Sequence, residues 1–131
     1  MNFKNLMIAE TLVSIGFGLV YIIYPQYLVD DYLVDKTGLN STVKIIAMHY
    51  GALLITVGIL QFYCRNAQPS FARKAILFIP LLSNFSVVLI SFYSLSKGIE
   101  NNMIWTVIIP LLFMSGWAAW LLWKEKDLKL V

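Results

Sequence analysis

Four long apolar runs dominate this sequence and leave room for little else. They cover residues 6–24, 43–63, 74–96 and 103–123, and none of them alternates with the period of two that is typical of a strand. A helix of about 20 apolar residues spans the hydrocarbon core of a bilayer. The sequence therefore predicts an all-α, polytopic membrane protein in which residues 1–131 form a single four-helix transmembrane bundle.

The composition excludes several classes of protein. Of the 131 residues, 60% are apolar and only 13% are charged, whereas about a quarter of the residues of a soluble domain are charged. Four spans occupy roughly 80 positions, which leaves too few for a second folded domain. The basic residues flank the spans and form no stripe interleaved with aromatic residues, so we expect contact with the lipid bilayer and none with nucleic acid.

Polar and special residues mark the ends of the runs. Pro25 stops the first run, and Gly98 suits a left-handed stop after the third. Asn40 and its two successors can cap the second helix. The segment 25–42 mixes aromatic, aliphatic and acidic residues, which fits either a short amphipathic stretch at the membrane interface or an ordinary packed loop. The other two connections are short, so consecutive helices should be antiparallel neighbours.

The distribution of Lys and Arg predicts the orientation in the membrane. Positive residues in short loops stay on the cytoplasmic side. We therefore expect both termini to face the cytoplasm. One side would carry Lys4, Arg65, Arg73, Lys74, Lys124, Lys126 and Lys129, and the opposite side only Lys36, Lys44 and Lys97.

Glu10 lies inside the first run, where a carboxylate costs about 2.5–3.5 kcal/mol at the centre of a membrane helix. Such a group normally faces protein or water. One interpretation places it near the cytoplasmic interface, paired with Arg65, Arg73 or Lys74. A second interpretation gives it a role in binding a ligand or a proton, and a third lets it reach out to water.

His49 is the only histidine, and it lies about two turns into the second run. At that depth it would be level with Tyr21, Ser91 and Tyr93, and a structural hydrogen bond across helices is favoured over a proton relay or a cofactor ligand. A zinc site needs three or four converging ligands. One His and Cys64 on opposite sides cannot supply them, so we expect no metal.

Asn84 lies near the middle of the third run, on one stripe with Pro80 and Ser91. Pro80, and Pro110 in the fourth run, each remove a helix hydrogen bond, which predicts a kink in both helices. A small cavity bounded by polar residues at this depth is one interpretation, and hydrogen bonds that merely hold the bundle together are the other. The candidate lining residues are Ser14, Tyr21, Thr56, Ser91 and Ser115.

Small residues predict where helices approach closely. Ser14 and Gly18 in the first run, Ala47, Gly51 and Gly58 in the second, and Gly116 in the fourth would allow backbones to come together, as small residues do in lipid.

The pattern of glycines resembles that of small four-helix bacterial membrane proteins known as DoxX-like. It consists of a first helix with Gly16 and Gly18 that ends at Pro25, followed by the run Gly51–Leu54 and then Gly58. The resemblance implies a location in the bacterial inner membrane, and some members of that group are accessory subunits of membrane redox systems. A second, weaker resemblance is to small multidrug transporters, which carry one membrane-embedded Glu in the first helix, preceded by Ala, like Ala9 and Glu10 here.

Three functions are compatible with these features. The first is a non-enzymatic membrane protein that acts by association, as an accessory subunit or a homo-oligomer, because small-residue faces occur without converging catalytic groups. The second is a proton-coupled transporter or channel that uses Glu10 in a homodimer. The third is a protein that binds a hydrophobic ligand or a quinone near Asn84 and His49. The sequence carries no catalytic motif and predicts no particular cofactor.

Overall fold

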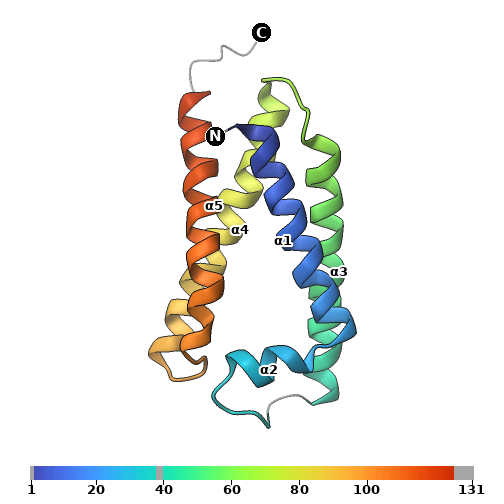
Figure 1. Ribbon diagram of the computed structural model, residues 1–131, viewed down its shortest axis with the longest axis vertical. Coiled ribbons are helices and arrows are strands. Elements are labelled where there is room, and N and C mark those ends of the chain that lie inside the picture. The colour runs from blue at the N-terminus through green and yellow to red at the C-terminus, as the bar shows by residue number, and fades with distance from the viewer. Residues whose placement is uncertain (1, 38–39, 126–131) are drawn as a thin grey trace.

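A computed structural model describes residues 2–37 and 40–125, and it is helical almost throughout (Figure 1). Four of its helices, counting η1 with α5, are long and apolar enough to cross a membrane. The predicted all-α fold with four candidate membrane spans is therefore confirmed. In chain order the elements are α1 (Phe3–Ile23), α2 (Gln26–Tyr32), α3 (Ser41–Cys64), α4 (Phe71–Ser96), the 3-10 turn η1 (Asn102–Ile104) and α5 (Trp105–Lys124).

Side-chain caps set the helix starts. The side chain of Asn40 accepts a hydrogen bond from the amide of Val43 at 2.9 Å, and that of Ser70 accepts one from the amide of Arg73 at 3.2 Å. The Ser70 cap explains why α4 begins earlier than residue 74. After α4 the chain turns at Gly98, whose φ of +67° is in the left-handed region that favours glycine.

The helices α1 and α3 pack backbone to backbone. A Cβ atom added at Gly18 would lie 2.7 Å from the carbonyl oxygen of Gly51, and one added at Gly51 would lie 2.7 Å from that of Gly18. Near the other end of the pair, the hydroxyl of Thr11 donates to the carbonyl of Gly58 at 3.1 Å. A Cβ at Gly116, in contrast, would meet no described atom within 4 Å, so the expectation of close packing there is wrong.

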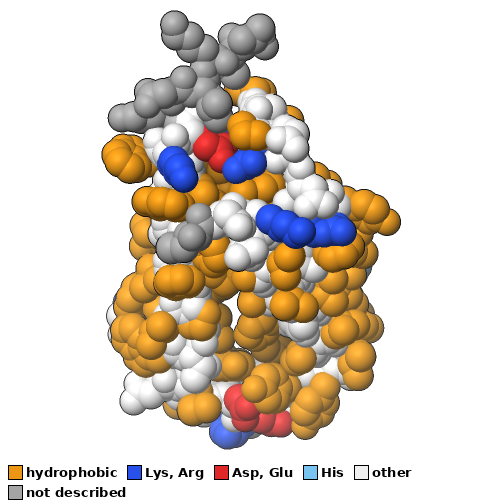
Figure 2. All heavy atoms as spheres, turned by 45° about the horizontal axis from the view of Figure 1, so that its top comes forward, with side chains coloured by type: hydrophobic (Ala, Val, Ile, Leu, Met, Phe, Trp, Pro, Cys, Tyr) orange, Lys and Arg blue, Asp and Glu red, His pale blue; other side chains and the backbone are white. Residues whose placement is uncertain are grey.

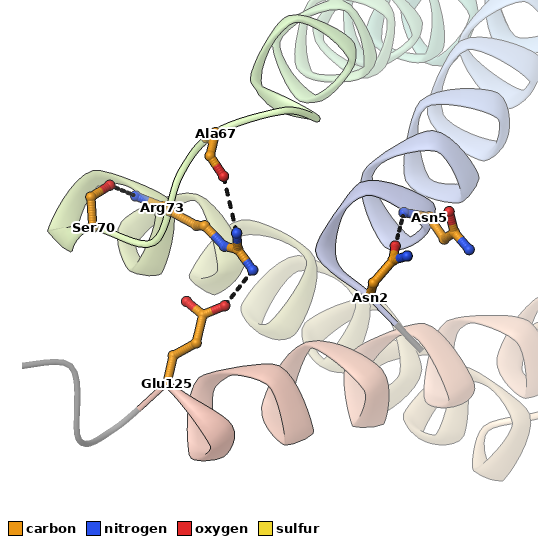
Figure 3. Close-up of polar contacts among 6 residues, drawn as sticks. All are labelled: Asn2, Asn5, Ala67, Ser70, Arg73 and Glu125. Carbon is orange, nitrogen blue, oxygen red and sulfur yellow. Dashed lines mark hydrogen bonds and ion pairs between the residues drawn. The ribbon is translucent and has the colours of Figure 1, made fainter.

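The other two long helices, α4 and α5, form a second antiparallel pair, and both continue through their internal prolines, Pro80 and Pro110. The two pairs meet at the end of the molecule where α1 begins (Figure 1). There Arg73 of α4 forms an ion pair of 2.5 Å with Glu125, just beyond α5 (Figure 3). We call this end, where α1 begins, the inner end. Its core, the inner core, consists of Phe3, Leu6, Met7, Leu77, Met114, Ala118 and Leu121.

At the opposite end, α2 lies across the mouth of the bundle (Figure 1). The segment 25–42 thus contains a short helix, with Val29 buried beneath it. Asn101 fixes the end of α2, because its side-chain amide donates to the carbonyl of Asp31 and its backbone amide donates to that of Tyr32, both at 2.7 Å. A hydrogen bond to Tyr32, with the nearby charge of Asp31, raises the pKa of Tyr27 on α2 to about 12.

Charged side chains gather at the two ends of the molecule. In the space-filling view most of the visible Lys and Arg side chains lie toward the end that carries the termini, and acidic side chains are visible at both ends (Figure 2). Between these ends the visible surface is mainly apolar. This arrangement is the one expected for a bundle whose middle is surrounded by lipid tails.

Candidate functional site

A cavity of about 460 Å³ lies between the two helix pairs. Its volume is within the range of small-molecule sites in proteins, and most of its lining is aliphatic or aromatic. The space-filling view shows a hollow between the two halves of the molecule (Figure 2). Val29 of α2 and Leu33, which follows that helix, line one end of the cavity, while Glu10, Gln61 and Asn84 line the region nearer the inner core.

These three residues form a buried polar cluster built from three helices. Glu10 on α1 is 3% exposed, and it accepts a hydrogen bond of 2.7 Å from the side-chain amide of Asn84 on α4. The side chain of Gln61 on α3 also lies beside the Glu10 carboxylate. One amide therefore orients the carboxylate, and a second lies next to it, at a place where water is largely excluded.

Gln61 also carries a buried polar atom without a partner. Its side chain is 1% exposed, and its amide oxygen forms no hydrogen bond in the described part of the structure. An unpaired buried acceptor costs about 1–3 kcal/mol. Gln61 lines the cavity, so this unpaired oxygen lies close to the space that a bound molecule would occupy.

The cavity opens sideways rather than toward either end. The inner core and α2 close its two ends. Some lining residues are nevertheless exposed, and all of them belong to α3 or α4, two helices that touch only slightly. The cavity therefore opens to the side, where the two helix pairs face each other along their apolar length. These exposed lining residues are Val43, Tyr50, Leu53 and Ser83.

The structure separates the polar residues that the sequence suggested as a lining. Ser14, Tyr21 and Ser91 do line the cavity. Thr56 does not, because it lies exposed on α3 with its hydroxyl donating to the carbonyl of Ala52. Ser115 is buried, but it lies between the helices of the second pair and donates to the carbonyl of Leu81 at 3.1 Å.

Glu10 has different partners from those expected. The proposed pairing with Arg65, Arg73 or Lys74 is wrong, because the Glu10 carboxylate accepts its hydrogen bond from the neutral side-chain amide of Asn84. Arg73 is engaged by Glu125 and by the carbonyl of Ala67 (Figure 3). The physical reason is depth: Glu10 lies more than a turn inside the inner core residue Phe3, so a guanidinium at the membrane surface is out of reach.

His49 is not part of this cluster. It is exposed on α3, and its Nδ1 donates to the carbonyl of Ile45, one turn earlier in the same helix, at 3.0 Å. The expected hydrogen bond across helices is therefore wrong. The face of α3 that meets α1 carries Gly51 and Gly58, whereas His49 is exposed and is not among the residues that line the cavity.

Comparison with known proteins assigns the chain to a family. A family model described as a domain of unknown function, DUF8292, matches residues 8–125. The chain belongs to this family. No curated protein and no solved structure matches it. The matched part of this DUF8292 chain includes all three members of the polar cluster and every residue that lines the cavity.

Sequence reasoning missed Gln61 in this DUF8292 chain. The residue lies in the last turn of an apolar run, where a polar side chain is ordinarily read as the start of the membrane surface. A signal was present, because Gln61 follows Leu54 and Val57 at the spacing of seven and four that keeps residues on one helix face. The spacing does not show which residue Gln61 meets, because Glu10 is fifty-one positions away in the sequence.

Proposed function

We propose that this DUF8292 protein is a non-enzymatic integral membrane protein that binds a lipid-soluble small molecule in the cavity between its helix pairs. The observation that carries the proposal is the polar cluster of Glu10, Gln61 and Asn84 at one end of an otherwise apolar cavity. Binding sites for small molecules combine apolar walls with a few convergent polar groups in this way. The sideways opening supports a ligand that arrives from the bilayer.

The association hypothesis loses its main support. It rested on small-residue faces available to a partner, but Gly18, Gly51 and Gly58 are used within the chain, between α1 and α3. A homo-oligomer or a partner subunit stays a prediction, as does the DoxX-like resemblance with its link to redox systems. Proton-coupled transport through a homodimer also stays a prediction, and the cavity within one chain gives Glu10 a simpler role.

Filling the cavity should abolish ligand binding. Ala47 is half-buried and lines the cavity, so Ala47→Trp places an indole in the space that a ligand would occupy. Native mass spectrometry of the protein released directly from its membrane should show an additional small-molecule mass for the unaltered chain and none for Ala47→Trp. The matched control is Ala52→Trp, an exposed position of the same helix outside the cavity, which should retain the adduct.

An adduct that persists in Ala47→Trp would contradict the proposal, as would its absence from the unaltered chain. A mass equal to a second polypeptide would instead favour the association hypothesis. The controls matter because a tryptophan at a lipid-facing position is well tolerated, so loss of the adduct in both variants would indicate general misfolding.

We also infer that both termini face the cytoplasm and that the chain lies in the bacterial inner membrane. Five basic residues at the inner end support this orientation, while Asp30, Asp31, Asp35 and Glu100 lie at the α2 end. Single cysteines placed in a Cys64→Ala background test it. On intact cells a membrane-impermeant maleimide should label Thr37→Cys and spare Gln68→Cys. The reverse pattern would overturn the orientation.

A further inference from the structure

At its inner end the cavity carries an unpaired acceptor and a carboxylate, while the serine and tyrosine hydroxyls of the lining can both donate and accept. The amide oxygen of Gln61 has no partner, and the Glu10 carboxylate lies beside it. The second acid in the lining, Glu100, is already hydrogen-bonded by the hydroxyl of Ser94. No Lys, Arg or His occurs among the described residues that line the cavity.

This imbalance selects among ligand head groups. A carboxylate out of water is stabilised by a positive charge close to it, and an unpaired acceptor is stabilised by a donor. An ammonium group with N–H bonds supplies both. A quinone carbonyl can only accept hydrogen bonds, so it would leave the Gln61 oxygen unpaired, and a ligand carboxylate would be repelled by Glu10.

The rest of the cavity suits a hydrocarbon chain. Glu10 and Tyr21 both line it, and along one helix they are separated by about 16 Å. The lining between them is mostly apolar, with side chains such as Val13, Phe17 and Leu111. A molecule with its head at Glu10 therefore extends an apolar tail toward α2.

From the unpaired oxygen and the uncompensated carboxylate, we infer that the ligand is a lipid-soluble amine with at least one N–H bond. It binds as an ammonium ion that donates to Glu10 and Gln61, with its apolar part in the remaining cavity. This inference rests on the proposed function, because it specifies the ligand of the same cavity.

A series of probes with one tail and different heads tests it. The protein is placed in phosphatidylcholine nanodiscs with equal mole fractions of dodecylamine, dodecanol, dodecyltrimethylammonium or dodecanoic acid, and bound masses are measured by native mass spectrometry. Dodecylamine should bind about tenfold or more tightly than dodecanol, which lacks the charge, and than dodecyltrimethylammonium, which lacks N–H bonds. Dodecanoic acid should bind least.

Two variants assign the preference to these side chains. Glu10→Gln should bring the ratio of dodecylamine to dodecanol close to one, whereas Asp35→Asn, the same change of charge at an exposed position outside the cavity, should leave it unchanged. Gln61→Met removes the free acceptor with little change of shape, so it should lower the ratio of dodecylamine to dodecyltrimethylammonium. The Gln61→Met result is independent of whether Glu10→Gln folds.

Equal binding of dodecylamine and dodecanol in the unaltered chain would overturn the inference, as would an amine preference that survives Glu10→Gln. Binding of none of the four probes would overturn it as well. The proposed function is tested by a separate result. If Ala47→Trp removes an adduct carried from the protein's own membrane while the probes show no head-group preference, the cavity binds a ligand of another class.

Discussion

Replacing Gly18 by Ala should destabilise this protein by about 1–3 kcal/mol, although alanine is the better helix former. The added Cβ would lie 2.7 Å from the carbonyl oxygen of Gly51 and 2.7 Å from a side-chain carbon of Ile55. The first of these atoms belongs to the backbone and cannot turn aside. The helices α1 and α3 must therefore separate, which also loosens the contacts of their neighbours.

Gly16 provides a matched control two residues away on the same helix. A Cβ there would meet no described atom within 4 Å, so Gly16→Ala gains helix propensity without a clash. It should stabilise the protein by up to about 0.5–1 kcal/mol. Unfolding in mixed micelles with increasing sodium dodecyl sulfate measures both changes. Equal effects of the two substitutions would show that α1 and α3 are not in backbone contact.

Glu10 and Asn84 should show strong energetic coupling. Asn84→Leu removes the donor at 2.7 Å from the buried carboxylate, and Glu10→Leu leaves the buried amide of Asn84 without its acceptor. Each single substitution should cost about 1–3 kcal/mol. In the double variant both partners are absent, so neither is left buried and unpaired. Its destabilisation should therefore be about 1–3 kcal/mol smaller than the sum of the two single destabilisations.

The same unfolding assay completes the cycle. Ser86, an exposed residue two positions along α4, supplies the control: Ser86→Leu combined with Glu10→Leu should give additive effects. Additive effects in the Glu10 and Asn84 cycle would mean that the hydrogen bond between these side chains contributes nothing to stability. The polar cluster would then no longer support a binding site at this place.

The candidate site was only partly readable from the sequence. Glu10 and Asn84 stood out because polar residues inside a membrane span are costly and need a reason. The contact between them could not be predicted. Their depths in the membrane, estimated from the limits of the apolar runs, placed Glu10 near the surface and Asn84 near the middle. Thr56 and His49 failed for a related reason: depth along a helix was estimated, but the face that each side chain presents was not.

Four candidate membrane spans, their approximate limits and the small-residue positions of the first two could be predicted from the chain alone, because length, hydropathy and small side chains act locally along each helix. Which helix faces meet became known from the folded bundle. Packing of Gly18 against Gly51 holds α1 to α3, the first pair diverges from α4 and α5, and the resulting space brings Glu10, Gln61 and Asn84 together. Rotation of a helix about its axis costs nothing until a neighbour is present, so that choice belongs to the assembled bundle.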